Sequence, residues 1–275
     1  MRIAEKISSL QNPRVKEIVK LYRSRNRKEN NLIVVEGIAE IKMAVSSGLK
    51  AEYFMIHPAL FNETELYGNK DIFGNTPCFE VNSQVFNKIT YRQNNEGILA
   101  VMQAGNLILN DIKLSNLPLI IVLEAVEKPG NLGAVLRTAD AVGADAVIVC
   151  DPQTDIYNPN VIRSSLGCVF TRQIAVCSSE EALQWLKKNN IEPVAASLSA
   201  TKLHFNTNLN KPVAFIMGTE ASGLTDFWLQ NSKTQVLIPM LGKIDSLNVS
   251  VSMAILVYEA LRQRNYAGSD ITAKK

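Results

Sequence analysis

A dense group of polar side chains lies near the carboxyl end of the sequence, in residues 238–250 (IPMLGKIDSLNVS). We interpret this run as a short strand ending at a proline, followed by a polar loop and a buried helix. Ser246, Asn248 and Ser250 place hydroxyl and amide groups at the start of that helix. Helix capping alone explains one such group. The remaining polar groups indicate that this helix start also contacts a ligand.

A second group follows the apolar run at 119–123 and reads EAVEKPGNLGAVLR over residues 124–137. Gly130 and Gly133 permit a close approach to the backbone. Arg137 points away from the apolar face of the expected helix, and a guanidinium there can bind phosphate through several donors. The alternative is a surface arginine beside an ordinary turn.

A third group, IMGTEASG at residues 216–223, ends another apolar run. Gly218 at the tip of the expected strand lets a ligand lie against the backbone. Glu220 pairs with a cation or lies in the first turn of a helix, where a carboxylate is also favourable. Ligands of open α/β sheets bind at the carboxyl ends of strands, where all three groups are expected.

Several classes of protein are disfavoured by what the sequence lacks. Neither phosphate-loop spacing nor G-x-G-x-x-G occurs, which argues against a nucleoside triphosphate or NAD as the ligand. Two histidines and four cysteines without a C-x-x-C pair indicate no metal site and no disulfide framework. No apolar run is long enough to cross a membrane, and the N-terminus does not resemble a signal peptide. We therefore expect a cytoplasmic protein that does not associate with membranes.

The elements that position these groups form two successive α/β patterns. Residues 1–104 are expected to form a small α/β domain, residues 105–117 a linker, and residues 118–275 a second α/β domain. In the first domain the predicted elements are helices at 12–25, 36–47 and 83–88 and strands at 32–35, 53–56, 78–81 and 98–102. In the second they are strands at 119–123, 146–149, 194–197, 213–217 and 236–238 and helices at 129–142, 182–188 and 249–262. The last helix is apolar nearly all round, which predicts burial or a subunit interface.

Positive charge is concentrated at the N-terminus. Residues 1–30 carry nine basic and three acidic side chains, so this segment is +6 and the rest of a chain of net charge +3 is −3. A basic N-terminal arm of this kind indicates contact with a polyanion, and the alternative is a solvated helix face. The candidate contact residues are Arg14, Lys16, Arg23 and Arg25.

The three groups, in this order, resemble the motifs of the SpoU (TrmH-type) branch of the SPOUT methyltransferases. The resemblance covers residues 117–265 and consists of Asn131-x-Gly133-x-x-x-Arg137, Gly218-x-Glu220-x-x-Gly223, and IPM-x-G followed by SLNVS at 246–250. Many relatives have Asp-Pro just before the first motif, where this chain has Glu-Lys-Pro-Gly at 127–130. The first domain resembles the L30e-like substrate-binding domain of the same family, through NPRVK at 12–16, VVEGIAEIKMAV at 34–45 and EGILAVM at 96–102.

The resemblance implies an α/β fold with a mostly parallel sheet and a deep C-terminal trefoil knot, an exception to unknotted topology. It implies S-adenosylmethionine as the cofactor and a homodimer formed through the catalytic domain. The cofactor-contacting positions it indicates are Gly218, Ile238, Met240 and Leu247, and the functional polar positions are Asn131, Arg137, Glu220, Ser246 and Asn248.

We therefore expect methylation of a ribose 2′-hydroxyl in structured RNA. Arg137 is expected to bind phosphate and stabilise the developing alkoxide. It is a poor candidate for the base, because the pKa of an arginine is so high that its guanidinium stays protonated and cannot readily accept a proton. Asn131, Ser246 and Asn248 are expected to orient the ribose and the loop, and Glu220 to hold Arg137 or the loop. RNA phosphates are expected to bind the basic N-terminal arm, so that removing residues 1–28 weakens RNA binding.

The extra N-terminal domain favours ribosomal RNA over transfer RNA as the substrate, by analogy. Two further hypotheses stay open at this point. One is a non-catalytic RNA-binding or ribosome-assembly protein on the same fold, and the other is an unrelated doubly wound nucleotide-binding enzyme.

Overall fold

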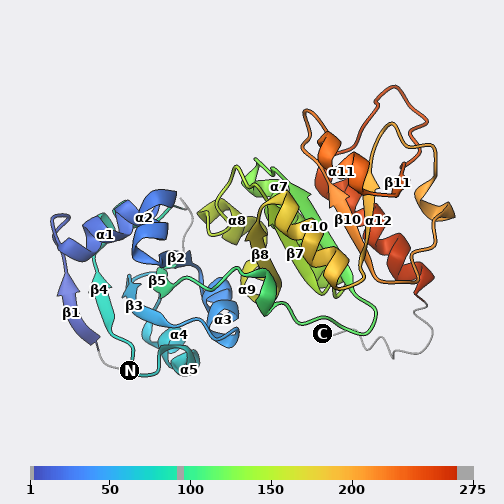
Figure 1. Ribbon diagram of the computed structural model, residues 1–275. Helices are drawn as coiled ribbons and strands as arrows, with labels where there is room; N and C mark the ends of the chain where they lie inside the picture. Colours follow the sequence, from blue (N-terminus) through green and yellow to red (C-terminus); the bar gives the residue numbers. More distant parts are fainter. Residues whose placement is uncertain (1–2, 92–95, 265–275) are drawn as a thin grey trace. The chain divides into compact units, whose positions relative to one another are not determined.

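The structure, a computed structural model, describes residues 3–91 and 96–264. It divides into two compact units (Figure 1). The first unit comprises Met1–Asn106 together with Asp155–Thr171, and the second comprises Leu107–Thr154 together with Arg172–Lys275. A short segment of the carboxyl-terminal half of the sequence therefore packs with the first unit.

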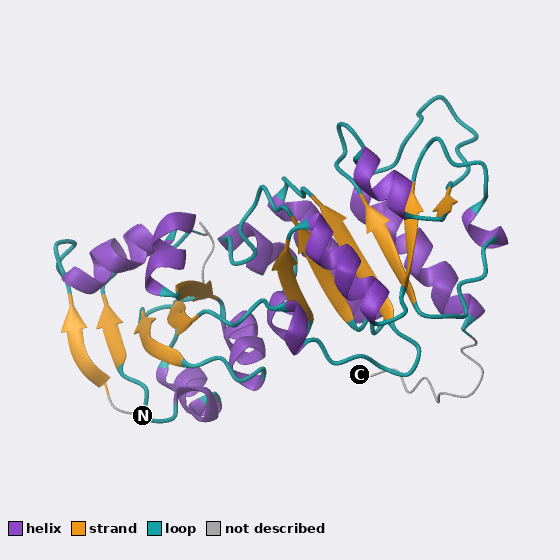
Figure 2. Cartoon of the chain, in the orientation of Figure 1, coloured by secondary structure: helices purple, strands orange, loops and turns teal. Residues whose placement is uncertain are grey.

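The first unit is built on a five-stranded mixed sheet with the order β1-β4-β3-β5-β2 (Figure 2). Its strands are β1 (Ile3–Ile7), β2 (Leu32–Glu36), β3 (Ala51–Ile56), β4 (Cys78–Val81) and β5 (Ile98–Gln103). β4 pairs in parallel with β1 and β3, whereas β5 pairs antiparallel with β3 and β2. The four predicted strands are confirmed, and β1 is an additional strand that its short sequence, with Glu5 and Lys6 side by side, did not reveal.

The helices of the first unit pack around this sheet. They are α1 (Pro13–Leu21), α2 (Ser24–Asn30), α3 (Ile38–Ser46), α4 (Glu63–Gly68), α5 (Lys70–Phe73), α6 (Ser83–Ile89), α8 (Pro159–Ser164) and α9 (Cys168–Thr171). The predicted start of the first helix is confirmed, because Asn12 Oδ1 accepts a hydrogen bond from the Arg14 amide at 2.9 Å and Pro13 follows it. The single helix predicted at 12–25 is wrong. The backbone of Arg23 has an extended conformation, and this break separates α1 from α2.

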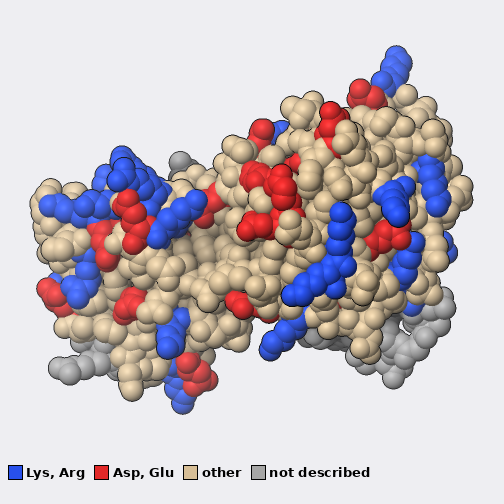
Figure 3. All heavy atoms as spheres, viewed as in Figure 1, with Lys and Arg blue, Asp and Glu red and all other residues tan. Residues whose placement is uncertain are grey.

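The basic N-terminal segment is part of the folded first unit and not a separable arm. β1 is a strand of the sheet, and α1 contributes Val15, Ile18 and Leu21 to the core. Arg27 is 4% exposed and forms an ion pair with Asp155. The predicted arm is therefore not a separate segment, and removing residues 1–28 would remove a strand and part of the core together with the positive charge. The exposed Lys and Arg side chains still gather over α1 and α2 (Figure 3).

The second unit is an α/β structure around a six-stranded parallel sheet with the order β11-β9-β10-β6-β7-β8. Its strands are β6 (Leu119–Glu124), β7 (Ala146–Cys150), β8 (Gln173–Cys177), β9 (Glu192–Ala196), β10 (Val213–Met217) and β11 (Thr234–Val236). The predicted parallel α/β sheet is confirmed. β8 was not predicted, and the last strand lies two residues before the predicted 236–238.

Four helices accompany this sheet: α7 (Pro129–Ala141), α10 (Ser179–Lys188), α11 (Asp226–Asn231) and α12 (Val249–Gln263). Two single 3-10 turns lie at Leu109–Asp111 and His204–Asn206. The first turn belongs to the predicted linker, and Leu109 packs against the core of the second unit.

Helix α12 has one buried and one exposed apolar face. Met253, Leu256 and Val257 are fully buried, and the helix contacts α7 and β10. Val251 and Tyr258, by contrast, are 48% and 50% exposed. The predicted burial is thus confirmed for one face only. Within the described ranges, no helix is both long and apolar enough to span a lipid bilayer.

Candidate active site

The order of the strands brings the polar groups together. β6 and β10 are neighbours in register, with Leu123 opposite Met217. Because parallel neighbours end at the same edge of a sheet, the segment before α7 and the turn after β10 meet there. The third group reaches the same edge through the start of α12, which packs against α7 and β10.

Glu220 lies at the centre of this meeting point. Its Oε1 accepts hydrogen bonds from Asn131 Nδ2 at 2.5 Å and from Asn248 Nδ2 at 2.8 Å. Asn248 Nδ2 also lies 3.1 Å from Asn131 Oδ1. The ammonium of Lys128 donates to the other carboxylate oxygen. We call these four residues the Glu220 network, and it joins one or more residues of each predicted motif.

The network fixes the ionisation of its charged members. The hydrogen bond from Lys128 holds the pKa of Glu220 below its usual value of 4.5, and Asn131 adds to this effect. The same contact raises the pKa of Lys128 above its usual 10.5. Both groups are therefore charged at neutral pH.

Asn248 caps helix α12 with its side-chain oxygen and contacts the Glu220 network with its side-chain nitrogen. Its Oδ1 caps α12 by accepting hydrogen bonds from the Ser250 amide at 2.9 Å and the Ser250 hydroxyl at 2.6 Å. Its amide nitrogen faces Glu220. Capping therefore accounts for Ser250, and it also sets the direction in which the Asn248 amide points.

Glu220 is carried by a tight turn and not by a helix, because α11 begins only at Asp226. The backbones of Thr219 and Gly223 exchange hydrogen bonds of 3.0 and 3.1 Å across this turn. A Cβ on Gly218 would lie 2.1 Å from the carbonyl carbon of Gly223, so glycine is required there by the fold of the turn itself.

Glu124, which the sequence did not mark as functional, anchors this turn. It is 5% exposed at the end of β6 and accepts hydrogen bonds from the Thr225 amide at 2.9 Å and the Thr225 hydroxyl at 2.6 Å. The signal that could have found it was a carboxylate ending an otherwise apolar strand, because a buried charge requires partners. Glu124 thus ties the strand before the first motif to the turn of the second.

A hollow of about 340 Å³, partly open to solvent, lies beside the network. Leu123, Val126 and Val249 give it apolar walls, and Glu124, Glu127 and Glu220 surround it with carboxylates. The apolar walls fit the adenine ring of S-adenosylmethionine, and the carboxylates, of which Glu220 is paired with Lys128, fit its sulfonium cation. Within the described ranges, no group of three or more His, Cys, Asp or Glu side chains is arranged to hold a metal ion.

Other predicted site residues lie outside the network. Arg137 is exposed on α7 and forms no hydrogen bond or ion pair with any residue in the described ranges. Glu220 therefore holds the loop, through Lys128 and the two asparagines, and not Arg137. Ser246 is exposed and contacts Asp245 Oδ1 at 3.4 Å. Of the four predicted cofactor contacts, Gly218 lines the hollow, whereas the half-buried Ile238, Met240 and Leu247 are not among the described residues that line it.

The four residues of the first unit that were predicted to contact RNA differ in their exposure and in whether they already contact another side chain. Lys16 and Arg23 are exposed. The Arg14 guanidinium lies over the Phe79 ring, 4.3 Å from its centroid, and Arg25 pairs with Glu29 at 2.6 Å. Lys16 and Arg23 are thus the more accessible of the four for a phosphate.

Comparison with known proteins identifies the family. The SpoU rRNA methylase family matches residues 118–258, and the MRM3-like substrate binding domain matches residues 12–100. A crystal structure of an RNA 2′-O ribose methyltransferase is 40% identical with a TM-score of 0.81, over 94% of this chain and 99% of that one. An AdoMet-bound rRNA methyltransferase from Sinorhizobium meliloti is 29% identical with a TM-score of 0.85, over 94% and 97% of the two chains.

Similarity to a curated relative extends along the whole chain as well. The 23S rRNA (guanosine(2553)-2′-O)-methyltransferase RlmP of Bacillus subtilis (strain 168) is 27% identical over 254 residues, which cover 92% of this chain and 98% of the relative. The resemblance seen in the three motifs is thereby confirmed, and the chain belongs to the SpoU rRNA methylase family.

Proposed function

We propose that this protein is an S-adenosylmethionine-dependent methyltransferase that methylates a ribose 2′-hydroxyl in ribosomal RNA. The observation that carries the proposal is the Glu220 network, which joins all three motifs beside a hollow fitted to the cofactor. Two relatives support the substrate and the cofactor. The Bacillus subtilis relative is named a 23S rRNA 2′-O-methyltransferase, and the Sinorhizobium meliloti structure contains AdoMet.

The residues of the three motifs have distinct roles in the proposed reaction. When bound, the cofactor supplies a methyl group on a sulfonium, and its positive charge disappears as the methyl is transferred. Gly218, Ile238, Met240 and Leu247 would hold the cofactor. The Glu220 network would fix the walls of the site so that the methyl group and the ribose oxygen are aligned, and alignment of this kind provides much of the catalysis.

The exposed Arg137 would contact the RNA. Its guanidinium has no partner in the described ranges, so it is accessible to a phosphate and to the developing alkoxide. Ser246 would contact the ribose from the third motif.

The remaining features expected from the family are also part of the proposal. RNA recognition is assigned to residues 1–104 and catalysis to residues 118–275, with 105–117 as the linker and a trefoil knot in the catalytic part. A homodimer would form through the exposed apolar face of α12, which includes Val251 and Tyr258. The protein would act in the cytoplasm.

The test is transfer of labelled methyl from S-adenosylmethionine to unmodified 23S rRNA and, in separate reactions, to unmodified transfer RNA, by the wild type and by Arg137→Ala. We expect the variant to lose turnover while it binds S-adenosylmethionine with unchanged affinity, because Arg137 lies outside the hollow. Wild-type rates for Arg137→Ala at saturating RNA would overturn its role. Wild-type protein that binds the cofactor but labels no RNA would indicate a non-catalytic protein, and labelling of transfer RNA alone would identify transfer RNA as the substrate.

A further inference from the structure

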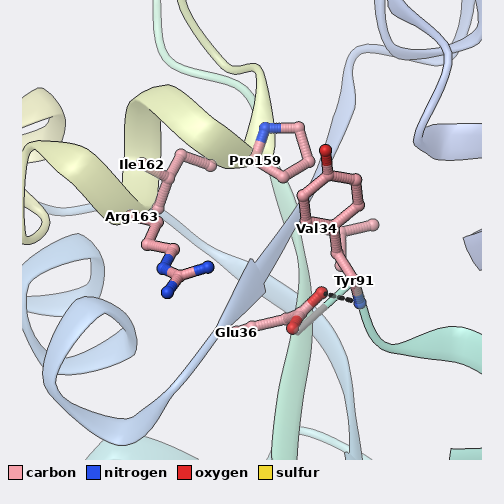
Figure 4. Close-up of a pocket in the computed structure, with 6 residues that line it drawn as sticks. All are labelled: Val34, Glu36, Tyr91, Pro159, Ile162 and Arg163. Atoms are coloured by element: carbon pink, nitrogen blue, oxygen red, sulfur yellow. Dashed lines mark hydrogen bonds between the residues drawn. The ribbon is translucent and has the colours of Figure 1, made fainter. Parts of the chain in front are cut away.

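A second hollow, of about 260 Å³, lies entirely within the first unit, outside the proposed active site (Figure 4). It is lined by Val34 and Glu36 of β2, by Tyr91, which follows α6, and by Pro159, Ile162 and Arg163 of α8. An apolar floor, one aromatic ring and one guanidinium therefore share a single surface, which we call the Tyr91 hollow.

Tyr91 is both exposed and firmly held. Its side chain is 52% exposed, yet its backbone amide donates to Glu36 Oε1 at 2.7 Å. Its hydroxyl accepts a hydrogen bond from Asn160 Nδ2 at 3.0 Å. Its ring also lies 5.8 Å from the ring of Tyr22, with a tilt of 34°. A ring fixed in this way loses little conformational freedom when a ligand stacks on it.

Glu36 and Tyr22 form the support beneath that ring. Glu36 is 7% exposed, and its Oε1 also accepts a hydrogen bond from the Tyr22 hydroxyl at 2.6 Å. Burial and the neighbouring Glu36 carboxylate raise the pKa of Tyr22, so its hydroxyl stays protonated and remains a donor. A buried carboxylate is costly unless hydrogen bonds satisfy it. Glu36 and Tyr22 are therefore held in place by the fold, and they hold Tyr91 in turn.

Arg163 supplies the positive charge of the hollow, whereas the Glu36 carboxylate that also lines it accepts hydrogen bonds from the Tyr22 hydroxyl and the Tyr91 amide. It is exposed on α8 and makes no hydrogen bond or ion pair within the part of the chain that the structure describes. Figure 4 shows its guanidinium extending from α8 toward the side on which Glu36 and Tyr91 lie.

We propose that the Tyr91 hollow binds one unpaired nucleotide of RNA, with the base stacked on Tyr91 and the adjacent phosphate bound by Arg163. Unpaired bases in RNA are recognised by stacking on aromatic side chains, and arginine binds phosphate through its fork of donors. The half-buried Pro159 borders the ring, and Val34 and Ile162, which are 4% and 2% exposed, form the apolar floor beneath. This inference rests on the proposed function, because it assumes that RNA is the substrate.

Equilibrium binding of unmodified 23S rRNA, transcribed in vitro, tests the proposal on the full-length protein. Tyr91→Leu removes the ring and Tyr91→Phe keeps it. We expect the affinity of Tyr91→Leu to fall by about 10-fold and that of Tyr91→Phe to stay within about 2-fold of wild type. Tyr67→Leu is the matched control, because Tyr67 is 72% exposed in the same unit but does not line the hollow.

Arg163→Ala tests the phosphate contact through its dependence on salt. One lost phosphate contact in a single strand should lower the slope of log affinity against log salt concentration by about 0.7. Lys70→Ala, which removes an exposed charge from α5, should leave the slope unchanged. All of these variants should bind S-adenosylmethionine as the wild type does.

The possible failures are distinguishable. If the wild type binds and methylates the RNA but Tyr91→Leu and Arg163→Ala behave as Tyr67→Leu and Lys70→Ala do, the Tyr91 hollow is not an RNA contact. Equal losses for Tyr91→Leu and Tyr91→Phe would reject stacking. If the wild type neither binds nor methylates RNA, the proposed function fails, and this inference fails with it.

Discussion

Asn131 and Glu220 are 89 positions apart in the sequence, and a hydrogen bond of 2.5 Å joins Asn131 Nδ2 to Glu220 Oε1. The pairing of β6 with β10 makes this contact possible, because the segments that follow the two strands leave the sheet at the same edge. Asn248, at the start of α12, completes the arrangement. Three motifs that are separate in sequence thereby become one site.

The carboxylate of Glu220 should be needed for that organisation. Glu220→Ala removes the acceptor shared by Lys128, Asn131 and Asn248. Because solvent screens the exposed network, we expect its loss to have a modest effect, about 10-fold in kcat/KM for methyl transfer. The exposed Glu180 on α10 provides the control variant Glu180→Ala. Equal rates for the two variants would show that the network is dispensable.

The contact between Lys128 and Glu220 makes a prediction about pH. The pKa of Glu220 is held below 4.5, so its pairing is intact above that pH and is lost as the pH falls through the lower value. The pKa of Lys128 is held above 10.5, so its pairing is intact below that pH and is lost as the pH rises through the higher value. We therefore expect the network to persist from pH 4.5 to pH 10.5.

Lys128→Met should shift the acidic limit of cofactor binding to higher pH. The variant removes the main cause of the depressed pKa of Glu220, so that carboxylate would take up a proton at a higher pH. The measurement is the affinity for S-adenosylmethionine across the acidic range, with Lys187→Met on α10 as the control. An acidic limit that coincides with that of the control would disprove the assigned role of Lys128.

The ion pair of Arg27 with Asp155 should be a main source of stability in the first unit. The two side chains are 5% and 12% exposed, and the pair measures 2.7 Å. Breaking a buried pair by removing one partner costs about 3–5 kcal/mol. We expect a loss of that size in the free energy of unfolding for Arg27→Met, measured by urea denaturation.

Arg25→Met is the matched control, because its pair with Glu29 is exposed, and such pairs contribute at most about 1 kcal/mol. The double variant Arg27→Met/Asp155→Asn should recover part of the loss, since it leaves no unpaired charge. Equal losses for Arg27→Met and Arg25→Met would contradict the structural importance of the buried pair.

Local pattern was sufficient for the strands and helices that carry the motifs. β10 and the first five residues of β6 are continuous apolar runs, every residue of both strands is buried, and α1 begins at the expected Asn12–Pro13. The break between α1 and α2 was hidden, because the sequence there lacks glycine or proline and the change occurs in the backbone of Arg23. β1 was hidden too, since only parallel pairing with β4 makes its short sequence a strand.

The sequence predicted which residues belong to the site but not which of them pair with one another. The sequence indicated Asn131, Glu220 and Asn248, and the structure joins them. No feature of the sequence favoured Lys128 over Arg137 as the cation beside Glu220, because that choice depends on how the turn after β10 faces the start of α7. The packing of residues 155–171 with the first unit was likewise invisible, since it depends on contacts such as Arg27 with Asp155.

The central claim is that the protein methylates a ribose in ribosomal RNA, and mapping 2′-O-methylation in total RNA tests it most directly. The comparison uses a strain that lacks the gene, the same strain supplied with the wild-type gene, and one supplied with Arg137→Ala. We expect one ribosomal RNA position to lose its methyl group in the deletion strain, to regain it with the wild type, and to stay unmodified with Arg137→Ala. Identical ribosomal RNA methylation in the deletion and wild-type strains would contradict the account.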